Sequence, residues 1–203
     1  MSRAKPDRRI SRTQHSLHRA LNTLILEKGY EATTITDIVS RADVGRSTFY
    51  AHHGSKEGLL LYGLHHLQNV LMDQRLLGGE SNPPLLGFSR VFFEHLHEYR
   101  DVFQSLRADE CGAIVTRKMK RILTEVVRQD LRHITSENTA GQVPRDAIVQ
   151  FTVDALFSIL LWWLEQKPTL SPVQADALFR RLTLPALAAG GFTPYRNTVA
   201  PVH

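Results

Sequence analysis

The sequence predicts an all-α protein of about nine helices. Apolar residues recur at helical spacing along most of the 203 residues, and the Val/Ile alternation that is typical of strands does not occur. Hydrophobic residues make up 42% and charged residues 22% of the chain, which is the ordinary composition of a globular protein. The length allows one large domain or two small ones.

The first expected elements are a basic arm and a long helix. Residues 1–10 are basic and lack apolar periodicity, so we expect a flexible arm. A helix is expected from about Ser11 to Lys28, and Gly29 is expected to end it as a C-cap. The apolar face of this helix consists of Leu17, Ala20, Leu21, Leu24 and Ile25.

Two short helices joined by a tight turn are expected next. Thr34 and Asp37 have the spacing of a capping box, which predicts a helix start. Asp43 and Gly45 tolerate turn conformations that a continuing helix forbids. The second helix, Arg46 to His52, is expected to expose a row of hydrogen-bond donors: Arg46, Ser47, Thr48, Tyr50 and His52. Such a pair is a helix-turn-helix, which places its second helix in a DNA major groove.

The charge distribution also favours DNA as a partner. Residues 1–56 hold ten Lys or Arg and five Asp or Glu, a net charge of +5 that equals the formal charge of the whole chain. Residues 57–203 are therefore neutral overall. A phosphate backbone is expected to attract the segment with the turn motif and to interact little with the rest.

The remainder of the chain is expected to be helical. Ser55 is a good N-cap for a helix that reaches Leu77, and a Gly- and Pro-containing break follows at residues 78–84. The later helices are expected at about Leu85–Arg100, Asp101–Arg107, Ala113–Ile134, Arg145–Glu165 and Pro172 to near Gly190. The helix at 145–165 is apolar almost all round, so we expect it to be buried against more than one neighbour. The expected domains are residues 1–56, residues 57–190 and a tail at 191–203.

Several blocks within residues 11–60 resemble the DNA-binding domain of the TetR/AcrR family of bacterial transcription regulators. These blocks are Gly29-Tyr30-x-x-Thr33-Thr34-Ile35-x-x-Ile38, Ala42-x-Val44, Arg46-x-Thr48-Phe49-Tyr50-x-His52 and Ser55-Lys56-Glu57-x-Leu59-Leu60. A shorter block, Leu161-Trp162-Trp163-Leu164-Glu165 with Ser171-Pro172 after it, is similar to a C-terminal subgroup of that family. Three positions depart from the family pattern. The turn has Asp43 and Gly45 where relatives usually have Gly and Ser, and His53 stands where relatives usually have Phe.

The resemblance and the exposed face of the second short helix make eight residues candidates for DNA contact: Thr34, Thr36, Arg46, Ser47, Thr48, Tyr50, His52 and Lys56. The resemblance implies that Thr34 and Thr36, at a helix N-terminus, contact phosphate with help from the helix dipole. It also implies that Arg46 faces the groove, that Lys56 sits on the backbone, and that Phe49 belongs to the core.

The resemblance further implies an N-terminal DNA-binding domain and a C-terminal domain that binds a ligand and dimerises. The dimer would form through the helices near 145–165 and 172–189 and would bind double-stranded DNA at a palindromic operator. Aromatic enrichment of the C-terminal helices predicts an apolar pocket for a small lipophilic effector. Its candidate lining residues are Phe92, Phe93, Leu96, Phe103, Leu106, Trp162 and Trp163. The alternative is that these rings only pack the core.

The function expected from the sequence is a transcriptional repressor that such an effector releases from its operator. One alternative is a regulator without a small ligand, whose C-terminal domain binds a protein. Another is a helical enzyme fused to a DNA-binding domain. The sequence offers no nucleophile–base pair, carboxylate pair or metal-ligand cluster, so we expect no enzyme activity, no catalytic residues, no metal and no cofactor.

The sequence also predicts a cytoplasmic location without a membrane span. The single cysteine, Cys111, excludes an intramolecular disulfide, and the N-terminus lacks the apolar segment of a secretory signal. The longest apolar run, Ile159 to Leu164, is too short to cross a bilayer.

Overall fold

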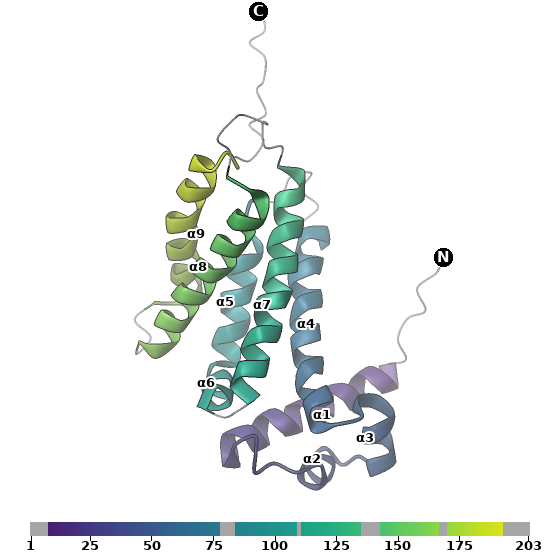
Figure 1. The fold of residues 1–203 in the computed structure, drawn as a ribbon. Helices are drawn as coiled ribbons and strands as arrows, with labels where there is room; N and C mark the ends of the chain where they lie inside the picture. Colours follow the sequence, from purple (N-terminus) through teal and green to yellow (C-terminus); the bar gives the residue numbers. More distant parts are fainter. Residues whose placement is uncertain (1–7, 78–83, 109–110, 135–142, 167–169, 193–203) are drawn as a thin grey trace, which may run out of the picture. The chain divides into compact units, whose positions relative to one another are not determined.

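The computed structural model describes residues 8–77, 84–108, 111–134, 143–166 and 170–192, and these residues form nine α-helices and no strand (Figure 1). The helices are α1 (Arg8–Lys28), α2 (Ile35–Ala42), α3 (Arg46–His53), α4 (Lys56–Leu77), α5 (Phe88–Glu98), α6 (Arg100–Ala108), α7 (Cys111–Asp130), α8 (Arg145–Glu165) and α9 (Pro172–Ala189). A short 3₁₀ helix, Leu131–His133, follows α7. The prediction of an all-α fold is confirmed.

The described helices belong to two compact units. The first unit contains α1, α2, α3, α6 and the N-terminal parts of α4 and α7; within it α1 packs against α2 and α6, and α2 packs against α3. The second unit contains the rest of α4 and α7 with α5, α8 and α9; within it α9 packs against α5 and α8. The domain boundaries expected after residues 56 and 190 stay a prediction.

Helix α1 begins earlier than the sequence predicted. It starts at Arg8, so residues 8–10 are helical and not part of an arm, while residues 1–7 lie outside the described residues. Ile10 is exposed, so the buried apolar face of the helix begins only further along the chain, at Leu17. The end of α1 is as predicted. Gly29 has a left-handed φ of 81°, and its N–H donates to the carbonyl of Ile25 at 2.9 Å.

Helix α5 begins later than predicted because the chain turns just before it. Leu86 has a φ of 60°, and the N–H of Gly87 donates to the carbonyl of Pro84 at 2.9 Å. The buried carboxylate of Asp130 accepts the Leu86 N–H at 2.6 Å and so fixes the turn. The sequence could not place this turn, since the stabilising carboxylate is 44 residues away.

Helix α8 is only partly covered in the single chain. Trp163 is 1% exposed, whereas its neighbour Trp162 is 43% exposed and Phe151 is 46% exposed. The apolar pattern extends to this exposed face, because an apolar pattern does not tell a face that the same chain covers from one that it leaves open.

The same helix is, among the described residues, the one long and apolar enough to cross a membrane by length and composition. Its most apolar window has a mean hydropathy of 1.8, and half of that window is buried inside the protein. The apolar run from Ile159 to Leu164 is too short to show that the whole helix is long and apolar enough to cross a membrane. A core helix has the same composition, so this is weak evidence for a membrane span.

Candidate nucleic-acid interface

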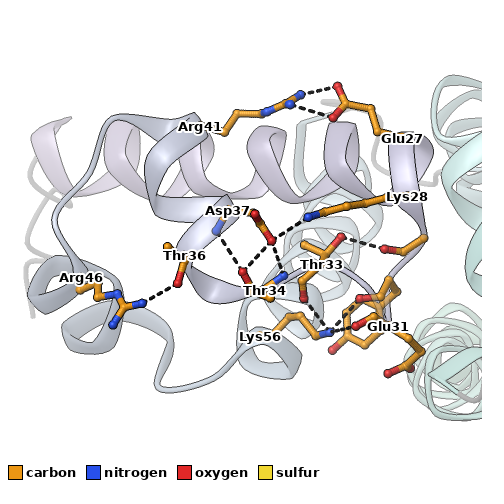
Figure 2. A network of polar contacts seen from close by, with 12 residues as sticks. Glu27, Lys28, Glu31, Thr33, Thr34, Thr36, Asp37, Arg41, Arg46 and Lys56 are labelled. Atoms are coloured by element: carbon orange, nitrogen blue, oxygen red, sulfur yellow. Dashed lines mark hydrogen bonds and ion pairs between the residues drawn. The ribbon is translucent and has the colours of Figure 1, made fainter.

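The start of α2 is held by the predicted capping box. The hydroxyl of Thr34 accepts the N–H of Asp37 at 3.2 Å, and the Asp37 carboxylate accepts the N–H of Thr34 at 2.8 Å (Figure 2). Lys28, at the end of α1, also donates to this carboxylate at 2.7 Å. The hydrogen bonds from Lys28 and then Thr34 lower the pKa of Asp37 well below its ordinary value. A rigid helix start results, whose first amides have no acceptor within the helix.

The turn between α2 and α3 adopts the geometry that the sequence predicted. Asp43 lies in the left-handed region with φ 52° and ψ 51°, and the N–H of Val44 donates to the carbonyl of Val39 at 3.0 Å. Gly45 is the N-cap of α3 but has a negative φ and no side-chain cap. A Cβ atom at this position would lie 3.8 Å from the hydroxyls of Ser47 and Thr48, which is ordinary contact. Glycine is therefore not required there by the backbone.

Two predicted contact residues, Thr36 and Arg46, lie together. The guanidinium of Arg46 donates to the hydroxyl of Thr36 at 2.5 Å, and both side chains are exposed (Figure 2). This bond joins the start of α2 to the start of α3. The two helix N-termini of the motif therefore present their hydroxyl and guanidinium groups on one continuous surface.

The other predicted contact residues of α3 differ in exposure. Tyr50 is 54% exposed and Ser47 is also exposed, while Thr48 and His52 are half-buried. Phe49 is fully buried, as the resemblance implied. Helix α3 thus keeps one apolar anchor in the core and a mixed polar face outside. Whether these side chains contact DNA stays a prediction.

His53, the departure from the family pattern, is half-buried at the end of α3. Its ring packs edge-on against Tyr62 at 5.3 Å and lies 6.0 Å from Phe49. Its Nε2 atom is buried and makes no hydrogen bond among the described residues. Burial, followed by the charge of His52, lowers the pKa of His53 below 6.5. The histidine therefore takes the place of an apolar ring as a neutral ring.

Lys56, the first residue of α4, is engaged inside the motif. Its ammonium donates to the carbonyls of Tyr30 at 2.7 Å and Thr33 at 2.9 Å, and the carbonyl of Glu31 lies at 3.5 Å (Figure 2). It also lies 4.1 Å from the centre of the Tyr30 ring. The expected phosphate contact of Lys56 stays untested, but its ammonium already has partners in the free protein.

A basic groove lies along α1 beside the end of α2. It has a volume of about 660 Å³, and its lining includes Arg12, His15, Arg19 and Arg41 but no carboxylate. Arg41 is held by a bidentate pair with Glu27, at 2.5 and 2.7 Å, and this bond lowers the pKa of the Glu27 carboxyl. The arginines of this groove are part of the positive charge of residues 1–56 that the sequence shows, and the structure places them along α1 and the end of α2.

Sequence reasoning missed the residues that brace the motif. Lys28 and Asp37 are nine residues apart, and Glu27 and Arg41 are fourteen apart. Neither spacing is a local signal, since both pairs form only because α1 packs against α2. Opposite charges at the end of one helix and within the next were the available hint.

The residues predicted to line an effector pocket are divided between the two units. Phe92, Phe93, Leu96 and Trp163 are buried in the second unit, where Phe93 contacts Trp163 edge-on at 5.6 Å. Trp163 donates its indole N–H to the carbonyl of Leu170 at 2.9 Å. Phe103 and Leu106 are buried in the first unit, and Trp162 is exposed on α8. The pocket itself stays a prediction.

Two family models match the chain. Residues 18–62 match the model of bacterial regulatory proteins of the tetR family, and residues 86–184 match a transcriptional regulator C-terminal region. The first match contains all eight predicted DNA-contact residues. The second begins at Leu86 and ends within α9, so it covers most of the second unit.

Relatives and solved structures agree with these matches. The chain is 30% identical over 94 residues to the transcriptional regulator TcmR of Streptomyces glaucescens. The matched segment is 46% of this chain and 42% of TcmR. It spans less than half the length of the curated relatives it matches. A TetR regulator from Streptococcus agalactiae is 26% identical, with a TM-score of 0.61 over 87% of this chain and 96% of that one.

A structure of Thermus thermophilus FadR, a TetR-family repressor in complex with lauroyl-CoA, shares the fold. It is 22% identical, with a TM-score of 0.54 over 94% of this chain and 100% of that one. The fold and the matched family models are those of transcriptional regulators rather than enzymes.

Proposed function

Because the chain belongs to the TetR family of DNA-binding transcriptional regulators, we propose that it is a cytoplasmic repressor. In this proposal a homodimer binds a palindromic operator, and a small lipophilic effector releases it. The observation that carries the DNA-binding part is the braced helix-turn-helix, in which a rigid α2 start and a donor-rich α3 share one surface.

The two helices divide the work of recognition. The N-terminus of α2, with Thr34 and Thr36, offers free amides and a positive dipole end to phosphate, which fixes the register of the protein on DNA. Helix α3 enters the major groove, where Arg46 is the side chain able to make a bidentate contact to guanine. Tyr50, the most exposed aromatic residue of α3, reaches the sugar-phosphate edge.

Exposed apolar side chains on α8 and α9 support the dimer. Phe151 and Trp162 are exposed on α8, and Val173 and Leu182 are exposed on α9. Phe151 and Trp162 are about three helical turns apart and so share one face of α8, and an exposed apolar face of this kind marks a surface that another molecule covers. Isologous packing of the two helices on their copies forms a four-helix interface and relates the two recognition helices by a two-fold axis.

An effector site in the second unit is supported by its aromatic interior. Phe92, Phe93 and Trp163 provide the rigid apolar surface on which lipophilic ligands bind. FadR, with its bound lauroyl-CoA, illustrates the chemical class of such a ligand. Release follows from linkage. A ligand that favours the arrangement unable to bind DNA lowers the affinity for DNA, and bound DNA lowers the affinity for that ligand by the same factor.

A genomic operator selection with the purified protein tests the DNA-binding part. We expect enrichment of a palindrome whose half-sites are separated by about one helical turn or slightly more. The Tyr50→Ala variant should weaken binding to every enriched sequence, whereas Arg90→Gln, which removes an exposed charge on α5, should not. The absence of any enriched sequence or footprint would contradict the proposal.

Tryptophan fluorescence with a panel of lipophilic compounds tests the effector part. A compound that quenches the buried Trp163 is expected to weaken operator binding in the same concentration range. The Trp162→Phe variant leaves Trp163 as the single tryptophan and so removes the signal of the exposed indole. Tight quenching with unchanged operator affinity would contradict the coupling.

A further inference from the structure

Two basic side chains next to α2 are paired with carboxylates. The guanidinium of Arg41 makes two hydrogen bonds to the carboxylate of Glu27, and the ammonium of Lys28 donates to the carboxylate of Asp37 at 2.7 Å. A carboxylate partner neutralises the charge of the basic group and accepts hydrogen bonds from its donors. The charges of Arg41 and Lys28 are therefore largely compensated within the protein.

Arg46 is held in a different way. Its acceptor is the hydroxyl of Thr36 at 2.5 Å, which is a neutral group, so the guanidinium keeps its full charge (Figure 2). A guanidinium has five N–H donors in one plane, and this bond uses one of them. A bidentate contact to the edge of a guanine needs two donors. The bond to Thr36 therefore restrains the side chain and leaves enough donors to read a base.

The acceptor in this pair is stiff and the donor is not. Thr36 is β-branched, which restricts its first side-chain torsion, and it belongs to the first turn of α2, whose start the capping box of Thr34 and Asp37 fixes. Arg46 is a long, exposed side chain at the first residue of α3, and ordering such a side chain at an interface costs conformational entropy. Because Thr36 already restrains this side chain in the free protein, part of that cost is removed before DNA binds.

We propose that Thr36 is a positioning residue for base recognition. Its hydroxyl directs the guanidinium of Arg46 toward the base edges of the major groove, so that α2 contributes to base preference through a side chain of α3. The inference deepens the proposed function and rests on it. It is compatible with the phosphate contact that the resemblance implied for Thr36, because a hydroxyl that accepts from Arg46 still has its own O–H to donate.

Competition between operators that differ by one base measures the role of Thr36. Thr36→Val keeps the branched shape but removes the hydroxyl, so it should lower the discrimination between bases about threefold to tenfold at one position of each half-site, the equivalent of one hydrogen bond. Discrimination at the other positions should stay unchanged. Thr36→Ser keeps the acceptor and should retain most of the discrimination. Thr124→Val, which removes a hydroxyl from α7 in the second unit, is the matched control.

A double-mutant cycle separates positioning from a base contact that Thr36 makes by itself. Because the proposed effect passes through Arg46, Thr36→Val should cause no further loss of discrimination in an Arg46→Met background, and both single variants should relax the same operator position. An equal loss in the two backgrounds, or a loss at a different position, would show that Thr36 reads a base directly and would overturn the inference. A uniform loss of affinity for all operator variants would assign Thr36 only a phosphate or structural role and would also overturn it.

The motion of the Arg46 side chain in the free protein gives a second test, which needs no DNA. NMR relaxation of its Nε–H group should show restricted motion in the wild type and in Thr36→Ser, and wider motion in Thr36→Val. Unchanged motion in Thr36→Val would overturn the positioning role. If the wild type bound no operator, the proposed function would fail and this inference with it. If Thr36→Val bound the operator of the wild type with the same discrimination, only this inference would fail.

Discussion

The α2–α3 motif and the α8–α9 pair expose surfaces of opposite chemistry. The motif exposes hydroxyl, guanidinium and phenol groups, of which Thr36 and Arg46 are already bonded to each other. The α8–α9 pair exposes large apolar side chains, among them Phe151, Trp162 and Leu182. Both regions have a buried apolar side that anchors them, at Phe49 in one and at Trp163 in the other.

The difference indicates two kinds of partner. A polar surface with net positive charge remains well hydrated when free and gains from a charged ligand such as DNA. Exposure of an apolar surface to water is unfavourable, so covering that surface stabilises the protein, whatever the charge of the partner. Each of the following predictions tests one side of this contrast.

The largest effect is expected from a charge on the apolar surface. Trp162→Asp should place an unpaired carboxylate in the proposed dimer interface, where it costs several kcal/mol. Sedimentation should then show a monomer at concentrations at which the wild type is a dimer. Gln150→Asp, a charge on the polar side of the same helix, serves as the control and should stay dimeric. A wild type that is monomeric at micromolar concentration would contradict the proposed interface.

A smaller effect is expected from removing the guanidinium at the start of α3. Arg46→Met should lower operator affinity by about 1–3 kcal/mol and relax the base preference at one position of each half-site. Competition with single-base operator variants measures both changes, and Arg90→Met on α5 is the matched control. If Arg46→Met bound every operator variant with wild-type preference, the role of Arg46 in base reading would be wrong.

Loss of the α2 cap is expected to cost less. Thr34→Ala removes one half of the capping box and should lower the free energy of unfolding by about 1 kcal/mol. Thr34→Ser keeps the hydroxyl and should restore most of that loss. Chemical denaturation monitors both variants. Equal stability of the alanine and serine variants would show that the box contributes nothing measurable.

The smallest effect is expected from pH. Because burial lowers the pKa of His53 in the folded state, the unfolded chain binds more protons between that pKa and 6.5. Stability should therefore be full above pH 6.5 and should decrease as the pH falls through this window. His53→Phe should remove this contribution. The melting temperature of the variant minus that of the wild type should therefore be larger at acidic than at alkaline pH. His52→Phe, at the neighbouring ring, provides the control. An identical pH dependence in wild type and His53→Phe would contradict the prediction.

Local rules accounted for much of the helix-turn-helix. The capping box of Thr34 and Asp37, the left-handed turn at Asp43 and the cap at Gly29 depend on residues within four positions of each other. Such short-range geometry is determined by side-chain chemistry and backbone sterics, which a sequence displays directly. The N-cap role of Ser55 is another case, since its hydroxyl accepts the N–H of Gly58 at 2.9 Å.

The sequence by itself determined the all-α class, the place of the two short helices and the segment that carries the positive charge. Only the tertiary structure decided where Lys56 directs its ammonium, because its acceptors lie 23 and 26 residues earlier in the chain. Only the tertiary structure separated Trp162 from Trp163, since both belong to a helix that is apolar on nearly every side. The physical reason is the same in both cases: periodicity and spacing describe a helix and its own neighbours along the chain, while the face that is covered depends on how helices pack.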